Sequence, residues 1–196
     1  MKNAFIPILS FLIILLAITG CRGTQSETYP QVISGIQELP PSLDVHLHNI
    51  IDPQLKGQTI SAIQLGMSWL YYDENGVGKG IEADAPHPLQ LKPDAFDDAT
   101  VNLSNVRCDC IEGKNHIAIE LRFGDNYLPE SFSVIRWGFD LVTGNQDIDD
   151  IIGLGEQVEA DGYKISIFDD GIDYLYAVYA NWSEGRSYYT FRTSAM

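Results

Sequence analysis

The nine residues NHIAIELRF, 115–123, alternate between apolar and polar side chains and decide the fold class. Four apolar side chains fall on one face of an extended strand: Ile117, Ile119, Leu121 and Phe123. The side chains between them fall on the other face: His116, Ala118, Glu120 and Arg122. Because a period of two is the repeat of a strand, this segment predicts a strand with one face buried and the other in water.

Other segments from Thr59 onward follow the same pattern. GMSWLYY, 66–72, precedes DENG, whose Asn-Gly pair favours a hairpin turn. SVIRWGFDL, 133–141, and YKISIF, 163–168, alternate, and IDYLYAVYANW, 172–182, is apolar on both faces, as expected of a central strand. Only QDIDDIIGLG, 146–155, suggests a short turn of helix. The chain therefore predicts an all-β domain, a sandwich or barrel.

The segment GIDYLYAVYANW followed by GRSYYTF resembles the terminal hairpin of immunoglobulin-like and fibronectin-like domains, in which a turn glycine precedes alternating tyrosines. The resemblance implies an immunoglobulin-like antiparallel β-sandwich, with Trp137 as its buried strand tryptophan. The sequence departs from antibody-type domains because no two cysteines have the spacing of an inter-sheet disulfide.

The N-terminus has the features of an export signal. Lys2 precedes an apolar run, 4–18, that is shorter than the roughly 20 residues of a spanning helix. The residues Ile18, Thr19, Gly20 and Cys21 resemble the lipobox of bacterial lipoproteins. That resemblance implies cleavage before Cys21, acyl chains on its thiol, and attachment to the outer face of the cell membrane.

The predicted organisation has four parts. Residues 1–20 form the signal peptide, and 21–33 form a polar tether. An irregular segment, 34–58, contains three prolines and one short strand around Asp44–His48, and residues 59–196 form the sandwich domain.

Three blocks of this domain resemble uncharacterised lipoproteins from Firmicutes. They are MSWLYYDENGVGKGIEADAPHPL, SVIRWGFD and YLYAVYANWSEGRSYYTF, within residues 60–193. The resemblance implies an extracytoplasmic domain on a Gram-positive cell and brings no catalytic residues.

The composition restricts the partners. The chain has a net charge of −15, and loss of Lys2 with the signal peptide lowers it by one, to −16. Such a surface repels nucleic acid and anionic lipid headgroups, so we expect no DNA or RNA binding. The same charge can attract cations or a basic partner.

Cys108 and Cys110 form a close pair in RCDCI, 107–111. On a strand their Cα atoms would lie about 6.6 Å apart, near the upper limit for a disulfide. Export favours oxidation, so a structural disulfide is the favoured interpretation. Free thiols remain open, as do a thiol-redox role and metal binding, although zinc would need two further ligands.

Three histidines stand in extended contexts. His46 and His48, in DVHLH, share one face and could bind a metal together, but barrel hydrolases that use such a pair need about 250 residues, more than this chain has. We interpret both as polar side chains of the N-terminal segment. His87 lies between Pro86 and Pro88, which stiffen the backbone, so it could be presented to a ligand, although a plain crossing between strands is favoured.

The acidic segment NQDIDDIIGLGE, 145–156, partly matches a calcium loop. The residues at positions 1, 3, 5, 8 and 12 are Asn145, Asp147, Asp149, Ile152 and Glu156. Asp150 replaces the glycine of position 6, and helical flanks are missing, so a solvated acidic loop is favoured.

No serine, histidine and aspartate set stands out from its spacing, and no cofactor motif is complete. We therefore expect a lipid-anchored binding module that is not an enzyme and needs no cofactor. Its partner would be another envelope protein, a peptide or a carbohydrate. The alternatives are a calcium-dependent protein or enzyme that uses the loop 145–156, and a redox role of Cys108 and Cys110.

Overall fold

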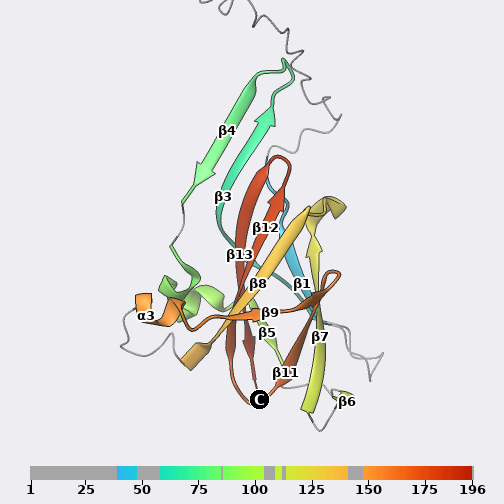
Figure 1. The fold of residues 1–196 in the computed structure, drawn as a ribbon, viewed down its shortest axis with the longest axis vertical. Coiled ribbons are helices and arrows are strands. Elements are labelled where there is room, and N and C mark those ends of the chain that lie inside the picture. The colour runs from blue at the N-terminus through green and yellow to red at the C-terminus, as the bar shows by residue number, and fades with distance from the viewer. Residues whose placement is uncertain are drawn as a thin grey trace, which may run out of the picture. The chain divides into compact units, whose positions relative to one another are not determined.

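The computed structural model describes residues 39–47, 58–84, 86–103, 109–111, 114–140 and 148–195, all within one compact unit, Ser34–Met196. Two β-sheets pack face to face in this unit (Figure 1). All strand pairs within these ranges are antiparallel except one. The predicted all-β sandwich is thereby confirmed.

The first sheet, sheet A, is built around the alternating segment 115–123. Its strands, in spatial order, are β10 (Ala160–Asp161), β11 (Lys164–Asp169), β7 (Lys114–Phe123), β1 (Leu43–Leu47) and β2 (Thr59–Ser61), and β6 (Asp109–Ile111) also pairs with β7. The alternation in β7 is as predicted, because Ile117, Ile119, Leu121 and Phe123 are all buried. On the opposite face Arg122 pairs with Glu120.

The second sheet, sheet B, has the doubly apolar segment near its centre. Its strands, in spatial order, are β4 (Gly78–Ala83), β3 (Ile63–Tyr72), β13 (Gly185–Ser194), β12 (Tyr174–Trp182), β8 (Ser131–Gly138) and β9 (Glu156–Val158). A short strand, β5 (Thr100–Asn102), runs parallel to β13. β12 and β13 form the predicted terminal hairpin, and β3 and β4 form the hairpin predicted from DENG.

The strand order is that of an immunoglobulin-like sandwich. β1, β7, β11 and β10 take the places of strands A, B, E and D, while β8, β12 and β13 take those of C, F and G. The segment between β1 and β7 is an insertion that carries β2 to β6. Its β3–β4 hairpin extends sheet B beyond β13 and projects from the sandwich (Figure 1).

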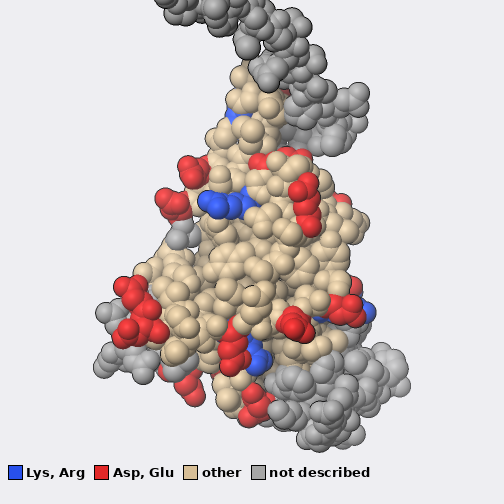
Figure 2. All heavy atoms as spheres, viewed as in Figure 1, with Lys and Arg blue, Asp and Glu red and all other residues tan. Residues whose placement is uncertain are grey.

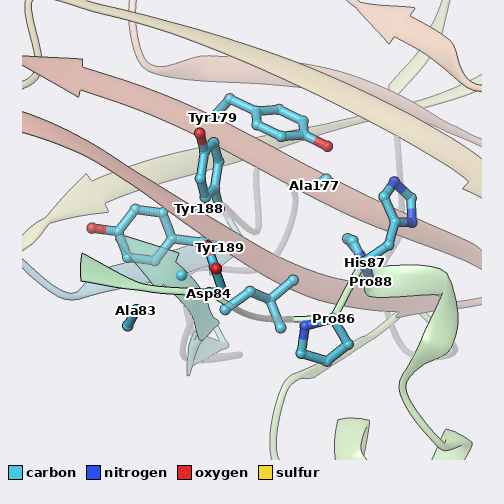
Figure 3. Close-up of a pocket in the computed structure, with 11 residues that line it drawn as sticks. Ala83, Asp84, Pro86, His87, Pro88, Ala177, Tyr179, Tyr188 and Tyr189 are labelled. Carbon is cyan, nitrogen blue, oxygen red and sulfur yellow. The ribbon is translucent and has the colours of Figure 1, made fainter. Parts of the chain in front are cut away.

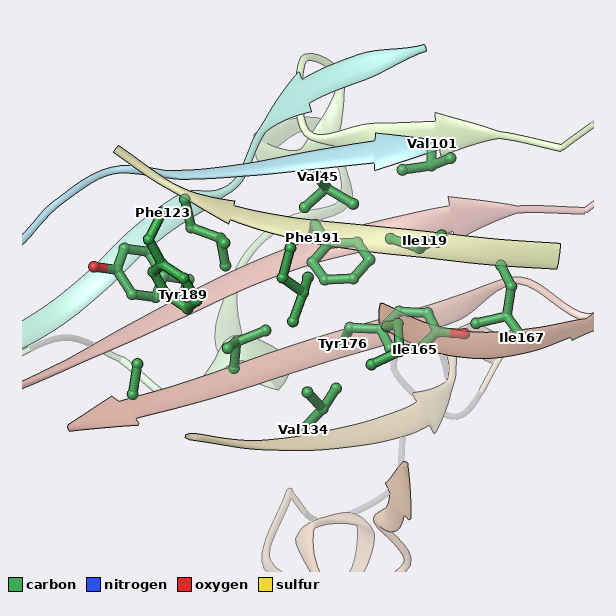
Figure 4. Packing of buried hydrophobic residues seen from close by; sticks show 14 of the residues in the cluster. Val45, Val101, Ile119, Phe123, Val134, Ile165, Ile167, Tyr176, Tyr189 and Phe191 are labelled. Carbon is green, nitrogen blue, oxygen red and sulfur yellow. The ribbon is translucent and has the colours of Figure 1, made fainter. Parts of the chain in front are cut away.

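The main core lies between the sheets and is rich in branched and aromatic side chains (Figure 4). Tyr176 stacks on Phe191, with ring centroids 4.8 Å apart. Trp69 and Trp182 are the tryptophans of this core, in edge contact at 5.4 Å.

Trp137 is buried, but not in the place that the immunoglobulin resemblance implied. It lies on the outer face of sheet B, in a second cluster with Phe139, Leu175 and Ala177. Val134 faces sheet A, and residues an odd number of positions apart on a strand point to opposite faces. Trp137 is thus a buried strand tryptophan, as expected, but it does not lie between the two sheets.

Short helical segments cover this second cluster. They are the 3-10 turns η1 (Pro88–Gln90) and η2 (Pro93–Phe96) and the helix α3 (Ile148–Ile152), which agrees with the predicted helical turn. Leu89, Phe96 and Ile151 from these segments pack on the sheet. These helical segments leave part of the outer face of sheet B uncovered.

The sandwich also includes residues ahead of the expected boundary at 59. The strand expected around Asp44–His48 is β1, which lies between β7 and β2 and buries Leu43, Val45 and Leu47 almost completely. Part of the segment expected to be irregular is thus an internal strand of sheet A.

The predicted signal peptide, Cys21 and the tether lie outside the described residues. In the part of the chain that the structure describes, no helix has the length and apolar character needed to cross a membrane.

Candidate functional site

A cavity of about 170 Å³ opens on the outer face of sheet B, beside the second cluster (Figure 3). Its floor comes from β12 and β13, and its walls come from the start of β3 and from the segment that leads from β4 into η1. β4 pairs with β3 only from Met67 onwards, where Ala83 is the last paired residue. The chain then leaves the sheet, and the cavity forms beneath it.

A β-bulge shapes one wall. Tyr188 pairs with Gly66 and Tyr189 pairs with Gln64, so Leu65 is an extra residue on β3. A bulge changes the direction in which a strand presents its side chains. Leu65 and Gly66 both line the cavity.

Two tyrosines dominate the floor. Tyr179 and Tyr188 are directly opposite each other on β12 and β13, with ring centroids 5.2 Å apart and planes at 72°. Burial and then the neighbouring Tyr188 raise the pKa of Tyr179, so its phenol is neutral at physiological pH. In Figure 3 the Tyr179 ring extends toward His87, and the Tyr188 ring lies beside it.

His87 is held in place from three sides. Its Nδ1 accepts the Leu89 amide N–H at 3.3 Å, and its own amide donates to Gln90 Oε1 at 2.9 Å, which makes a capping box for η1. Its ring meets the Trp137 ring edge to face at 5.4 Å. Since Nδ1 is an acceptor, the neutral ring carries its proton on Nε2. Burial lowers the pKa of His87, so the ring is uncharged at neutral pH.

The remaining walls are apolar apart from one carboxylate. Ala83, Pro86, Pro88 and Ala177 complete the lining, and among the described lining residues only Asp84 carries a net charge. Outside the lining, the Arg186 guanidinium lies over the Tyr188 ring, with its Cζ 5.8 Å from the centroid. On the face of the molecule in Figure 2, acidic side chains outnumber basic ones.

Of the other histidines, His46 is described and lies away from this site. His46 lies on the face of sheet A that is turned away from the core, where its Nδ1 is 2.7 Å from Thr59 Oγ1. His48 lies outside the described residues. Of the histidines named from the sequence, His87 alone is placed at the cavity.

The acidic segment is only partly described. Asp149 is on α3 and exposed, while Asn145 and Asp147 lie outside the described residues. Glu156 begins β9 and accepts hydrogen bonds from Arg136 Nε at 3.1 Å and Nη2 at 2.9 Å. The described residues contain no group of three or more histidine, cysteine, aspartate or glutamate side chains placed to hold a metal ion. Calcium binding by the segment stays a prediction.

The disulfide between Cys108 and Cys110 also stays a prediction. Cys108 lies outside the described residues, and Cys110 is described only through its backbone, which pairs with Asn115 between β6 and β7. Neither the disulfide nor a redox role is tested by these positions.

Sequence reasoning missed the two tyrosines of the floor. The signal was present, because a hairpin closed at SEGR places Tyr179 opposite Tyr188. The apolar character of both faces of 172–182 predicted a central strand covered on both sides. Only the packing of η1 and the β4 end shows that one part of that face stays open.

Comparisons with protein-family models, curated proteins and solved structures find no match to this chain. Its function is therefore inferred from the geometry of the cavity and from the sequence.

Proposed function

We propose that this chain is an exported bacterial lipoprotein, held at the outer face of the cell membrane by lipid on Cys21, whose sandwich domain is a binding module and not an enzyme. The cavity beside Tyr179, Tyr188 and His87, which we call the aromatic pocket, is its ligand site. The observation that carries the proposal is the lining of this pocket.

Ligand pockets are concave and mostly apolar, with a few polar groups that orient the ligand. The aromatic pocket has this composition, because aromatic rings, prolines and small apolar side chains line it together with Asp84 and His87. The ligand is a small molecule or a chemical group exposed on an envelope protein, a peptide or a carbohydrate.

Attachment follows from the first 21 residues. The apolar run before Cys21 and its lipobox support cleavage and lipidation, and two acyl chains give stable anchoring where one gives reversible binding. The polar tether then lets the domain stand off the membrane, where its acidic surface is repelled by anionic headgroups.

Fractionation of cells tests the anchor. We expect Cys21→Ala to be released from the membrane or misplaced, because no acyl chain can be added, while Cys110→Ala stays in the membrane fraction as the wild type does. A Cys21→Ala protein as firmly membrane-bound as the wild type would show the anchoring proposal to be wrong.

Photo-crosslinking in intact cells tests the pocket and does not require the ligand to be identified first. A diazirine amino acid replaces Ala83, at the wall of the pocket, or Glu74, in the exposed turn of the β3–β4 hairpin. We expect a defined mass adduct from position 83 and none from position 74. Tyr179→Ala in the same chain should remove that adduct. An adduct that persists with Tyr179→Ala, or no adduct from position 83, argues against a ligand in this pocket.

A further inference from the structure

The walls of the aromatic pocket suit a ligand coated with apolar groups. Leu65, Ala83, Pro86 and Ala177 present carbon atoms to the cavity. A primary ammonium would bring N–H donors that need acceptors, and an unpaired buried donor is costly. Methyl groups carry no such requirement.

The floor provides aromatic faces in two directions. The planes of Tyr179 and Tyr188 are inclined by 72°, and the two rings touch edge to face, so they do not form one flat surface. The ring faces that this contact leaves uncovered can attract a cation through their quadrupoles. The Arg186 guanidinium over the Tyr188 ring shows that this ring already contacts a cation at its rim.

Apart from Arg186 at the rim of the Tyr188 ring, the charge in and around the pocket favours a positive ligand. Asp84 is the one charged residue of the described lining, and the whole chain carries −15. His87 adds no charge at neutral pH, since its pKa is lowered by burial. Anionic ligands would meet the Asp84 carboxylate and the negative potential of the whole domain.

The volume fits one compact head group. An enclosed apolar cavity of about 150 Å³ holds one benzene molecule, and the aromatic pocket is of similar size, at about 170 Å³. A trimethylammonium group is within this size, and a long substituent would have to extend outside.

We infer that the aromatic pocket binds the quaternary ammonium group of a small free organic cation of the choline type. This inference rests on the proposed function of the pocket and narrows it to one chemical class. A quaternary ammonium group is positively charged and is covered with methyl groups. The methyl groups match the apolar walls, and the positive charge matches the aromatic rings and Asp84.

Calorimetric titration of the full lipidated protein in a non-ionic detergent tests the inference. The probes are choline, its uncharged carbon isostere 3,3-dimethylbutan-1-ol, ethanolamine and phosphocholine, each with a detergent blank. We expect choline to bind about tenfold more tightly than the isostere, which has the same shape without the charge. Ethanolamine should bind more weakly than choline, because its ammonium group is more strongly hydrated and has no methyl groups to contact the apolar walls. Phosphocholine should also bind more weakly, because its phosphate meets Asp84.

Variants of the protein distinguish the contribution of the Tyr179 ring to choline binding from the contribution of the pocket's shape. Tyr179→Leu keeps an apolar side chain and removes the ring, so the affinity for choline should fall about tenfold while that for the isostere is unchanged. Asp84→Asn should weaken choline binding, and Glu74→Gln, the matched removal of one exposed charge outside the pocket, should not. Arg186→Gln should tighten choline binding, because it removes a competing cation from the Tyr188 ring.

The outcomes distinguish this inference from the proposed function. Equal affinity for choline and the isostere overturns the ammonium inference and leaves the pocket as a ligand site. If phosphocholine binds more tightly than choline, the ligand is not a small free cation. That result overturns the inference and favours a phosphocholine group on an envelope component. Absence of binding by all four probes also overturns the inference, and the crosslink from position 83 then decides separately whether the pocket has another ligand.

Discussion

Two buried tyrosines of the main core use their hydroxyl groups differently. The Tyr189 hydroxyl donates to the carbonyl of Pro41, and so ties the N-terminal end of the described domain to β13. The Tyr176 hydroxyl is buried and has no hydrogen-bond partner among the described residues. Burial raises the pKa of both tyrosines to about 12, so both phenols are neutral at physiological pH.

Because of this difference, we predict that replacement by phenylalanine destabilises the domain at position 189 and has little effect at position 176. Tyr189→Phe should lower the free energy of unfolding by about 1 kcal/mol or more, since it leaves a buried carbonyl without its donor. Tyr176→Phe should change it by less than about 0.5 kcal/mol or increase it, because no hydrogen bond is lost. Urea denaturation of the two variants measures both values, and equal losses would contradict the prediction.

Gly185 is required by a close backbone contact where β13 starts. A Cβ built at this position would lie 2.0 Å from the Ser68 carbonyl oxygen, and φ is +154°. At Gly162, where φ is +59°, a Cβ built in the same way would have no atom within 4 Å. The first glycine is thus needed for the approach of β13 to β3, and the second only for its backbone angle.

We predict that Gly185→Ala lowers the free energy of unfolding by more than about 3 kcal/mol, because the β3–β13 contact must separate. Gly162→Ala should cost only about 1–2 kcal/mol, the cost of the left-handed conformation for alanine. Thermal unfolding of the two variants provides the comparison. A Gly185→Ala protein as stable as Gly162→Ala would mean that the contact is absent.

At the scale of an element, η1 links the outer face of sheet B to the pocket. Its cap depends on Nδ1 of His87 as an acceptor, and that atom can no longer accept when the imidazole is protonated. Because burial lowers the pKa of His87 in the folded state, the unfolded chain binds the proton more tightly. The stability contributed by neutral His87 is therefore complete above the ordinary pKa of 6.5 and is lost as the pH falls below it.

His87→Asn should remove this pH dependence while it keeps the cap, since the asparagine Oδ1 can accept the Leu89 N–H. We expect the unfolding midpoint of the wild type to decline more steeply than that of His87→Asn from about pH 7 to about pH 5. Urea titrations at several pH values measure the two slopes. Parallel slopes would show that His87 does not titrate differently on folding.

For the whole molecule, β1 decides where the folding unit begins. Its three buried side chains, Leu43, Val45 and Leu47, each contribute about 1.5–3 kcal/mol by burial. Their sum is comparable with the whole net stability of a domain, about 5–15 kcal/mol. Loss of β1 would also expose the backbone of β7, with which it pairs over five residues.

We therefore predict that residues 34–196 fold cooperatively as an isolated chain and that residues 59–196, the extent expected from the sequence, do not. Circular dichroism and thermal unfolding of the two chains test this. A cooperative transition in the shorter chain would mean that β1 is dispensable.

The sequence by itself determined most of the long strands and which of their residues share a face, because the period of two is a local property of the chain. It predicted β7 and its buried side chains, the terminal hairpin and the turn at DENG. It predicted that Trp137 is buried, but it could not tell which face of β8 meets sheet A, so it did not place Trp137 on the outer face of sheet B. It also missed the extent of the domain, since β1 is short and stands among prolines.

Only the tertiary structure decided the candidate site. His87 comes to Tyr179 and Tyr188 from a distant part of the chain, because β4 ends at Ala83 and the following segment crosses the sheet. The bulge at Leu65 depends on the register between β3 and β13, which no local pattern encodes. Alternation along a strand is set by neighbouring residues, whereas a pocket is set by which distant surfaces are left uncovered when the sheets and turns pack together.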